Sequence, residues 1–421
     1  MMTDSFTPFS SFWMGGFECT DQLNHYGNRV DLLALTGHLQ YTARDYALLK
    51  TFGISTVREG IRWSKVETRP YEYDFSSVRN MIDAARIHGI QQIWDICHFG
   101  YPDDLTPLHP HFRNRFVGMC IAFAEFYRDY APEFELIATP INELGFISWL
   151  GGEQASTTPY ARGIGWDIKY ALVGAYIEGI KAMKAINSTT KIMSTEPLVN
   201  IVPPLNAPDE MVFKAAEEHE LQFQATDMLT GLICPELGGS SELIDFMGFN
   251  FYYNNQWVFG DFTSLPWANL ELDPRWRGLS SLLLEAYTRY GKPIVLAETS
   301  HSGEHRPNWL ELITRECMKA IGAGVPLKGV CLYPIIDRPD WDHLHIWHHS
   351  GLWDADGDNP FGRYLHEPYA RAFLDAQHTL QIYRSAFHAG ITEGFIYLDQ
   401  GIGINGETKG TMISLAPEIL I

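Results

Sequence analysis

The sequence predicts an α/β protein built as a single (β/α)8 TIM barrel. Short apolar runs alternate with longer amphipathic segments along most of the chain, which is typical of βα units and parallel strands. Eight such runs can be counted, which is the number of strands in this barrel. Polar residues directly follow several of the runs, where the active site of such a barrel lies. A doubly wound sheet would show the same alternation, but the strand count and the polar strand ends favour the barrel.

The expected strands are short, apolar and rich in β-branched or aromatic residues, as strands buried on both faces are. In chain order they cover residues 12–18, 54–58, 91–98, 136–142, 191–195, 244–252, 294–298 and 329–333.

The expected helices carry apolar residues at helical spacing. In the segment 76–88, for example, Val78, Met81, Ile82 and Ala85 share one face, and Gly89 follows as a C-terminal cap. In chain order the helices cover residues 41–51, 76–88, 112–130, 166–186, 209–231, 278–290, 309–321 and 368–380.

The domain expected from this pattern is a barrel over residues 1–380. Residues 381–421 have weaker periodicity and several glycines, which predicts a C-terminal extension, either a small β appendage or a poorly ordered tail. Neither the role of this extension nor the oligomeric state follows from the sequence.

Composition excludes several classes of partner. The net charge is −20, from 31 basic and 51 acidic residues, and such a surface repels nucleic acids and anionic membranes. No apolar run approaches the ~20 residues of a membrane span, and the N-terminus lacks the pattern of a signal peptide. The six cysteines show no Cys-x-x-Cys pair, which indicates free thiols in a reducing compartment. We therefore expect a cytoplasmic protein.

Two stretches place a carboxylate at the end of an apolar run. Residues 293–300 read Pro-Ile-Val-Leu-Ala-Glu-Thr-Ser, and their apolar run ends at Glu298. The apolar run in residues 136–143 likewise ends at Asn142 and Glu143. A carboxylate is costly inside an apolar strand, so each acid should lie at the strand's end, in a cleft. A structural strand-end acid is the alternative for either one alone.

A pair of carboxylates across a pocket is the equipment for glycoside hydrolysis. One acid must keep its proton and the other must stay ionised, so their environments must differ. Arg58 and Tyr252 also follow expected strands, and they suit the task of keeping Glu298 charged. Asn142 suits a hydrogen bond to a sugar hydroxyl.

Six motifs occur in one order along the chain, each at an expected strand end. They lie at 12–22, 57–63, 95–99, 139–144 (Thr-Pro-Ile-Asn-Glu-Leu), 248–253 (Gly-Phe-Asn-Phe-Tyr-Tyr) and 296–300. In this order they resemble the motifs of the clan A glycoside hydrolases, and within them family 1, the β-glucosidase type. The resemblance extends over about residues 12–354, in a chain that is divergent and shorter than usual for that family.

The resemblance implies a role for each matching residue. Glu298 would be the nucleophile and Glu143 the acid/base, with Asn142 bound to the sugar 2-hydroxyl. Arg58 and Tyr252 would support the nucleophile. No cofactor and no metal are implied.

Sugar binding is implied for four further residues. Gln22 and His98 match glycone-binding positions of the family, and Trp341 follows them in the segment 338–341. That segment reads Arg-Pro-Asp-Trp where the family has Asn-Phe-Glu-Trp, so Asp340 replaces a sugar-binding glutamate. These departures leave the acid pair intact and leave the sugar and the aglycone open.

The loop 340–349 is rich in histidine and acid, a composition that can bind a metal. Contact with sugar is the interpretation we favour, because histidine and tryptophan over a sugar pocket stack on it and hydrogen-bond to it.

The sequence thus predicts a retaining β-glycosidase that hydrolyses a small β-glycoside by double displacement. Retention requires the two carboxyls to lie ~5–5.5 Å apart. The alternatives are a transglycosylase that uses the same glutamates, and a non-catalytic sugar-binding barrel that kept the motifs.

Overall fold

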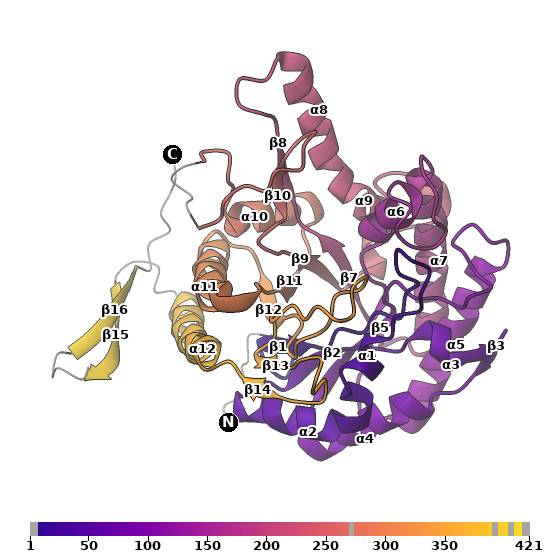
Figure 1. The fold of residues 1–421 in the computed structure, drawn as a ribbon, viewed down its shortest axis with the longest axis horizontal. Helices are drawn as coiled ribbons and strands as arrows, with labels where there is room; N and C mark the ends of the chain where they lie inside the picture. Colours follow the sequence, from indigo (N-terminus) through magenta and orange to yellow (C-terminus); the bar gives the residue numbers. More distant parts are fainter. Residues whose placement is uncertain (1–6, 269–272, 390–394, 403–407, 415–421) are drawn as a thin grey trace.

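The computed structural model describes residues 7–268, 273–389, 395–402 and 408–414. Within them, parallel strands close into an eight-stranded barrel surrounded by helices (Figure 1). The barrel strands are β1 (Trp13–Gly16), β2 (Thr56–Gly60), β5 (Gln91–Cys97), β6 (Ile137–Ile141), β7 (Lys191–Pro197), β9 (Phe246–Asn250), β11 (Ile294–Thr299) and β12 (Leu327–Leu332). The predicted (β/α)8 fold is confirmed, because each expected strand contributes to the barrel in sequence order and β12 pairs with β1.

The expected helices occur in the predicted order, but the last one extends to His388, and three short helices (Leu32–Leu35, Trp63–Val66 and Leu144–Gly152) were not expected. The helices around the barrel are α1 (Leu32–Leu35), α2 (His38–Thr51), α3 (Trp63–Val66), α4 (Ser76–His88), α5 (Phe112–Tyr130), α6 (Leu144–Gly152), α7 (Gly165–Ile186), α8 (Asp209–Glu220), α9 (Gln224–Thr230), α10 (Leu279–Tyr290), α11 (Arg306–Gly322) and α12 (Glu367–His388). Helix α4 ends as expected, because Gly89 adopts the left-handed conformation and its N–H bonds to Ala85.

One expected helix, 209–231, is wrong as a continuous element. A 3₁₀ turn at Leu221–Phe223 separates α8 from α9. Here the side chain of Gln222 accepts a hydrogen bond from the Val199 N–H and donates one to the His219 carbonyl. These side-chain bonds tie the turn to Val199, just after the strand at Lys191–Pro197, and they offset the backbone hydrogen bonds that a continuous helix would have made here.

The interior of the barrel is packed and is not a pore. Side chains from alternate strands fill it, among them Met14, Ile93, Met193, Val295 and Tyr333, each at most 1% exposed. A larger apolar cluster lies between the barrel and the helices. The active-site end therefore has a solid floor.

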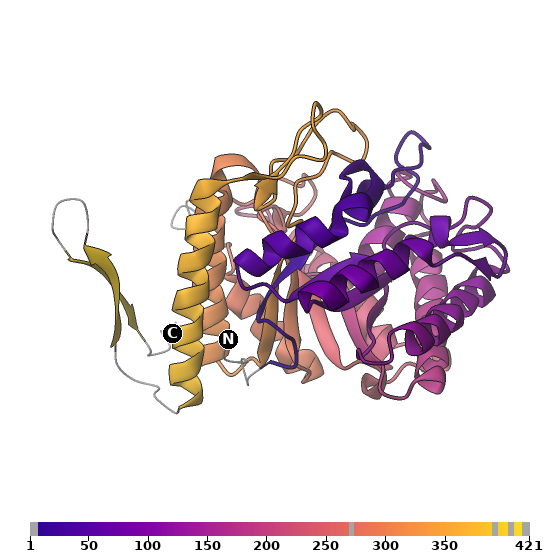
Figure 2. The same cartoon turned by 90° about the horizontal axis from the view of Figure 1, so that it is seen from below.

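Three short strand pairs of the described residues outside the barrel were not predicted: β3–β4 (Glu67–Arg69 and Glu72–Tyr73), β8–β10 (Asn200–Val202 and Gln256–Val258) and β13–β14 (Trp353–Asp354 and Tyr364–Leu365). A fourth pair, β15–β16 (Phe395–Ile402 and Thr408–Ser414), lies in the segment where a small β appendage was one of the two expectations. The pair β15–β16 is antiparallel and lies outside the barrel beyond α12 (Figure 2). The expected domain boundary at residue 380 falls inside α12.

No helix in the described ranges is long and apolar enough to cross a membrane. All six cysteines are free thiols, and five of them are buried.

Candidate active site

A cavity of about 1120 Å³ opens at the carboxyl ends of the barrel strands. Its wall includes Glu143, Tyr252 and Glu298, each of which lies within two residues of the end of a barrel strand. The two predicted acids, far apart in sequence, therefore face one space that is large enough for a sugar.

Glu298 lies on β11 and is 4% exposed. Arg58 donates to its Oε1 (2.8 Å), and the Tyr252 hydroxyl donates to its Oε2 (2.7 Å). A guanidinium and a phenol on opposite oxygens are the partners of an ionised carboxylate. Glu298 therefore faces the cavity with an arginine on one carboxyl oxygen and a tyrosine hydroxyl on the other.

Glu143 follows β6 and precedes α6, with a left-handed backbone (φ 48°) that a non-glycine residue rarely adopts. Its N–H bonds to the Thr195 carbonyl (3.0 Å), and its Oε1 accepts from the Asn250 amide (2.9 Å). Burial, together with the charge of Glu298, raises the pKa of Glu143 well above its ordinary value. Burial thus favours the protonated form of Glu143, and its carboxyl is close enough to Glu298 for the two groups to interact.

Arg58 joins the barrel strands below the cavity. Besides Glu298, it donates to Asp95 Oδ2 (2.6 Å) and to Asn142 Oδ1 (3.0 Å). Burial opposes the charge of Asp95, but the guanidinium of Arg58 holds the pKa of Asp95 below its usual value. Arg58 thus neutralises two buried carboxylates and orients the amide of Asn142.

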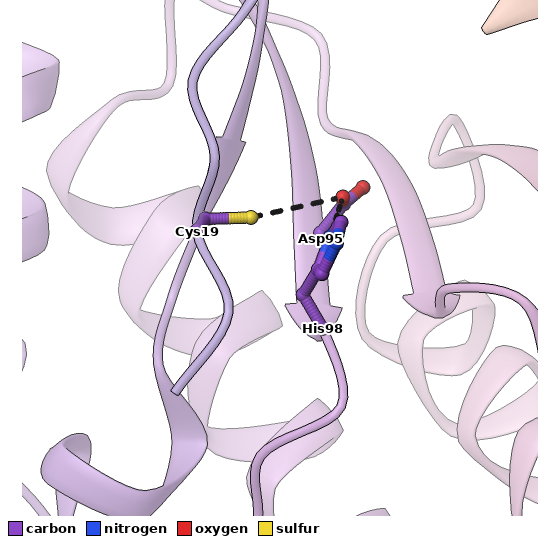
Figure 3. A group of neighbouring side chains, drawn as sticks. All are labelled: Cys19, Asp95 and His98. Carbon is purple, nitrogen blue, oxygen red and sulfur yellow. Dashed lines mark hydrogen bonds and ion pairs between the residues drawn. The ribbon is translucent and has the colours of Figure 1, made fainter. Parts of the chain in front are cut away.

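His98 is fixed from below by Asp95, whose Oδ2 bonds to its Nδ1 (2.9 Å; Figure 3). Its Nε2 lies 3.3 Å from the Asn142 amide nitrogen and faces the cavity. Burial acts against protonation, but the bond to Asp95 and the charge of Glu18 raise the pKa of His98. The ring also stacks parallel to Tyr333, with centroids 5.9 Å apart.

The remaining predicted sugar contacts are divided. Trp341 lines the cavity and packs edge-on against Phe99 (centroids 5.6 Å apart). Gln22 is buried, but among the described residues it is not part of the cavity wall. Asp340 also lies outside the wall, where its carboxylate accepts from the Asp342 and His343 N–H groups and bonds to His348 (3.1 Å). The structure therefore brings His98 and Trp341 to the cavity wall, whereas Gln22, Asn142 and Asp340 are not part of it.

Two buried acids of the cavity wall were missed in the sequence. Glu196 is the second-last residue of β7 and is 2% exposed, while Glu18 follows β1 and lies 3.7 Å from His98 Nε2. The signal for Glu196 was present, since it ends an apolar strand as Glu298 does. Burial raises the pKa of Glu196 to about 8.

Among the described residues, two groups of side chains could hold a metal ion by their spacing. One consists of Cys19, Asp95 and His98 (Figure 3), and the other of Asp337, His349 and Asp354. In each group an arginine already occupies a carboxylate, because Arg58 bonds to Asp95 and Arg306 bonds to Asp354. These arginine charges disfavour a cation, so the first group is better described as the support of His98.

Comparison with known proteins shows likeness in structure only. A β-glucosidase from Thermotoga maritima in complex with glucoimidazole superposes with a TM-score of 0.71 and 15% identity, over 88% of this chain and 99% of that one. A further structure of a family 1 β-glucosidase from the same organism superposes with a TM-score of 0.70 and 15% identity, over 87% of this chain and 97% of that one. An enzyme from Alicyclobacillus herbarius superposes with a TM-score of 0.67 and 15% identity, over 82% of this chain and 88% of that one. No family model matches the chain, and no curated protein matches it in sequence. The resemblance predicted from the motifs is thus confirmed as a likeness of fold in a divergent chain.

Proposed function

We propose that this protein is a retaining β-glycosidase that hydrolyses a small β-glycoside, with Glu298 as nucleophile and Glu143 as acid/base. One observation carries the proposal: two carboxyls face one cavity in opposite environments. Glu298 is bonded to Arg58 and Tyr252, whereas burial and the charge of Glu298 raise the pKa of Glu143. This is the division of roles that double displacement requires.

In the first step, a carboxylate oxygen of Glu298 attacks the anomeric carbon and forms an ester. The bond from that carbon to the leaving oxygen breaks, and the proton of Glu143 passes to that oxygen. Arg58 keeps Glu298 in position through its bond to Oε1. Tyr252 donates to Oε2 in the free protein. If Oε2 attacks, this hydrogen bond either breaks or moves with the oxygen.

In the second step, a water molecule attacks the same carbon while Glu143 takes one of its protons. The ester bond breaks, and Glu298 returns as a carboxylate stabilised by Arg58. The two reaction steps use only two side chains and a water molecule, so the proposed reaction needs no cofactor. If a sugar hydroxyl replaced the water, the same steps would give transglycosylation.

Asn142 and His98 are our candidates for contact with the glycone, with Trp341 as an aromatic wall. Asn142 is held by Arg58, and its amide faces His98. We assign Gln22 and Asp340 to sugar binding only if their loops rearrange when substrate binds. The six free thiols support a reducing compartment such as the cytoplasm.

The test is covalent trapping with a panel of 2-deoxy-2-fluoro β-glycosides, read by intact mass and peptide mapping. We expect one sugar label on Glu298 in the wild-type protein and none in Glu298→Gln. The same variant should lose at least about 10⁴-fold in kcat/KM on the matching 4-nitrophenyl glycoside.

The sugar that labels names the glycone. If no member of the panel labels a folded protein and none is hydrolysed, the proposal fails, and measurable binding of the same sugars would then favour the non-catalytic barrel. A label together with disaccharide products in place of free sugar would favour the transglycosylase.

A further inference from the structure

The end of strand β7 holds the chain on both sides of Glu143. The Thr195 carbonyl accepts a hydrogen bond from the Glu143 N–H (3.0 Å). The next side chain along β7, Glu196, accepts one through Oε2 from the Gly145 N–H (2.9 Å). Gly145 lies in the first turn of α6, the helix that starts directly after Glu143. Two consecutive residues of one strand therefore hold the backbone before and after the acid that we assign as acid/base.

Helix α6 begins at Glu143, but the side chain of Glu143 does not cap it. The first N–H groups of any helix have no partner inside the helix, and a side chain of the N-cap residue commonly accepts from one of them. Glu143 occupies the N-cap position and makes no such bond. Glu196 supplies the missing acceptor from outside the helix. The carboxyl of Glu143 is thereby left free to face the cavity.

The contact between Glu196 and α6 is close and buried. Glu196 is 2% exposed, and a methyl group on Gly145 would lie only 2.9 Å from its Oε2. A glycine is therefore what allows the carboxyl to reach the helix. The contact also acts on a strained residue, because Glu143 has a φ of 48°. Such a conformation persists only where the surroundings enforce it.

We propose that Glu196 is a positioning residue for the acid/base. Its carboxyl holds the first turn of α6 against the end of β7, and this contact fixes the direction in which the side chain of Glu143 enters the cavity. The inference rests on the proposed function and adds to it a third carboxyl that acts through Glu143. Glu196 lies in none of the six motifs of the sequence.

Glu196 also acts on Glu143 through its charge. Burial and the charge of Glu298 raise the pKa of Glu143, and the charge of Glu196 adds to this effect. Burial raises the pKa of Glu196 itself to about 8, so its charge forms as pH rises through that value. From then on, the second negative charge makes it harder for Glu143 to lose its proton. The other titratable or charged groups that face the two carboxyls are Arg58 on β2, Tyr252 after β9, and Lys169 and Tyr176 on α7.

The test uses two glycosides that share the glycone found by trapping and differ in the leaving group. The 2,4-dinitrophenyl group leaves without a proton, whereas the phenyl group needs one from the acid. Glu196→Ala removes the carboxyl. Glu196→Gln keeps an oxygen that can accept from the Gly145 N–H, but it cannot ionise.

The matched control is Glu316→Gln. Glu316 is a buried carboxyl of α11 that accepts from the Ser280 N–H (3.0 Å), at the second residue of α10, just as Gly145 is the second residue of α6. It is absent from the described cavity wall. The control therefore repeats the contact at a helix that carries no catalytic group.

We expect Glu196→Ala to lower kcat/KM on the phenyl glycoside by at least about tenfold, part of the contribution of a general acid. On the 2,4-dinitrophenyl glycoside kcat/KM should stay within about twofold, because that bond breaks without the acid. There kcat and KM should fall together, since Glu143 is also the base of the second step. Glu196→Gln should recover most of the loss on the phenyl glycoside.

The pH profile separates a positioning role from a structural one. The alkaline limb of kcat/KM reports the pKa of the acid in the free enzyme. In Glu196→Gln this limb should move to lower pH by about half a unit or more, because no charge forms beside Glu143. In Glu316→Gln it should not move. Denaturant unfolding verifies that each variant is folded, and the profile of Glu196→Gln decides if Glu196→Ala does not fold.

Equal losses on the two glycosides would overturn the inference, since a misplaced acid affects only the bond that needs a proton. An alkaline limb that stays in place in Glu196→Gln would overturn it as well. If the wild-type protein neither hydrolyses a glycoside nor forms a 2-fluoro label, the proposed function itself fails. If it does both, and the Glu196 variants behave like Glu316→Gln, only the role of Glu196 fails.

Discussion

Arg58 and Glu59 are neighbours on β2, yet their side chains belong to different buried networks. Arg58 faces the barrel interior and joins Glu298, Asp95 and Asn142 under the cavity. Glu59 faces the helix layer, where its Oε1 accepts from Tyr46 (2.6 Å) and bonds to His38 (2.9 Å). Adjacent strand residues point to opposite faces, so one strand serves both networks.

The second network is as charged as the first. His38 lies between Glu59 and Asp45, and Arg363 donates to both oxygens of Asp45 (2.9 Å each). Burial acts against it, but Glu59 and Asp45 raise the pKa of His38 to about 9. His38, Asp45 and Glu59 are at most 1% exposed and are absent from the described cavity wall.

The comparison teaches that a perturbed pKa alone does not identify a site. Structural ion networks perturb pKa values as strongly as catalytic ones. What distinguishes the Arg58 network is an open cavity against one of its carboxylates. We therefore expect substitutions in the first network to affect catalysis and stability, and those in the second to affect stability alone.

The largest effect is expected from Arg58→Met. The change leaves Asp95 and Glu298 as buried carboxylates without their cation, which should cost about 3–5 kcal/mol of unfolding free energy. Activity should fall at least about 10²-fold as well, because the support of the nucleophile is lost. Denaturant unfolding and kcat/KM on a 4-nitrophenyl glycoside measure the two effects. A folded Arg58→Met protein with full activity would contradict the assignment of this network to the site.

A smaller and purely structural effect is expected from Glu59→Gln, one residue along the same strand. His38 and Tyr46 would lose a charged partner, which should cost about 1–3 kcal/mol of unfolding free energy. The folded protein should keep kcat/KM within about twofold, since the side chain of Glu59 faces the helix layer and not the cavity. A loss of activity comparable with that of Arg58→Met would remove the distinction between the two networks.

The sequence predicted the first network better than the second. Asn142, Glu143, Tyr252 and Glu298 lie at or just past the ends of parallel strands, which a closed barrel brings together, and Arg58 in the middle of β2 reaches Glu298 from the barrel interior. Their mutual contacts therefore follow from the fold class. For Glu59 the alternation of strand side chains gives only a direction, toward the helix layer, and does not identify His38 or Tyr46 as its partners.

Long loops limited the prediction. Gln22 and Asp340 lie in irregular segments after β1 and β12, where no periodicity relates position to direction. Asp340 in particular satisfies its own loop through backbone N–H groups, an alternative that acids in turns often take. Helix α6 was missed because Leu144–Gly152 is short and nearly apolar throughout, without an amphipathic pattern.

The smallest effect is expected from pH and concerns the second network. His38 has its pKa raised from 6.5 to about 9 in the folded protein, so its contribution to stability is complete below pH ~6.5 and is lost as pH rises through about 9. The carboxyl of Glu196, whose pKa burial raises to about 8, also makes the folded protein less stable as pH rises from ~4.5 to 8. Unfolding free energies from pH 6 to 10 for wild type and His38→Gln isolate the share of His38, because the variant keeps Glu196. An equal slope in both proteins would show that His38 does not hold its proton, and the charged account of the Glu59 network would then fail.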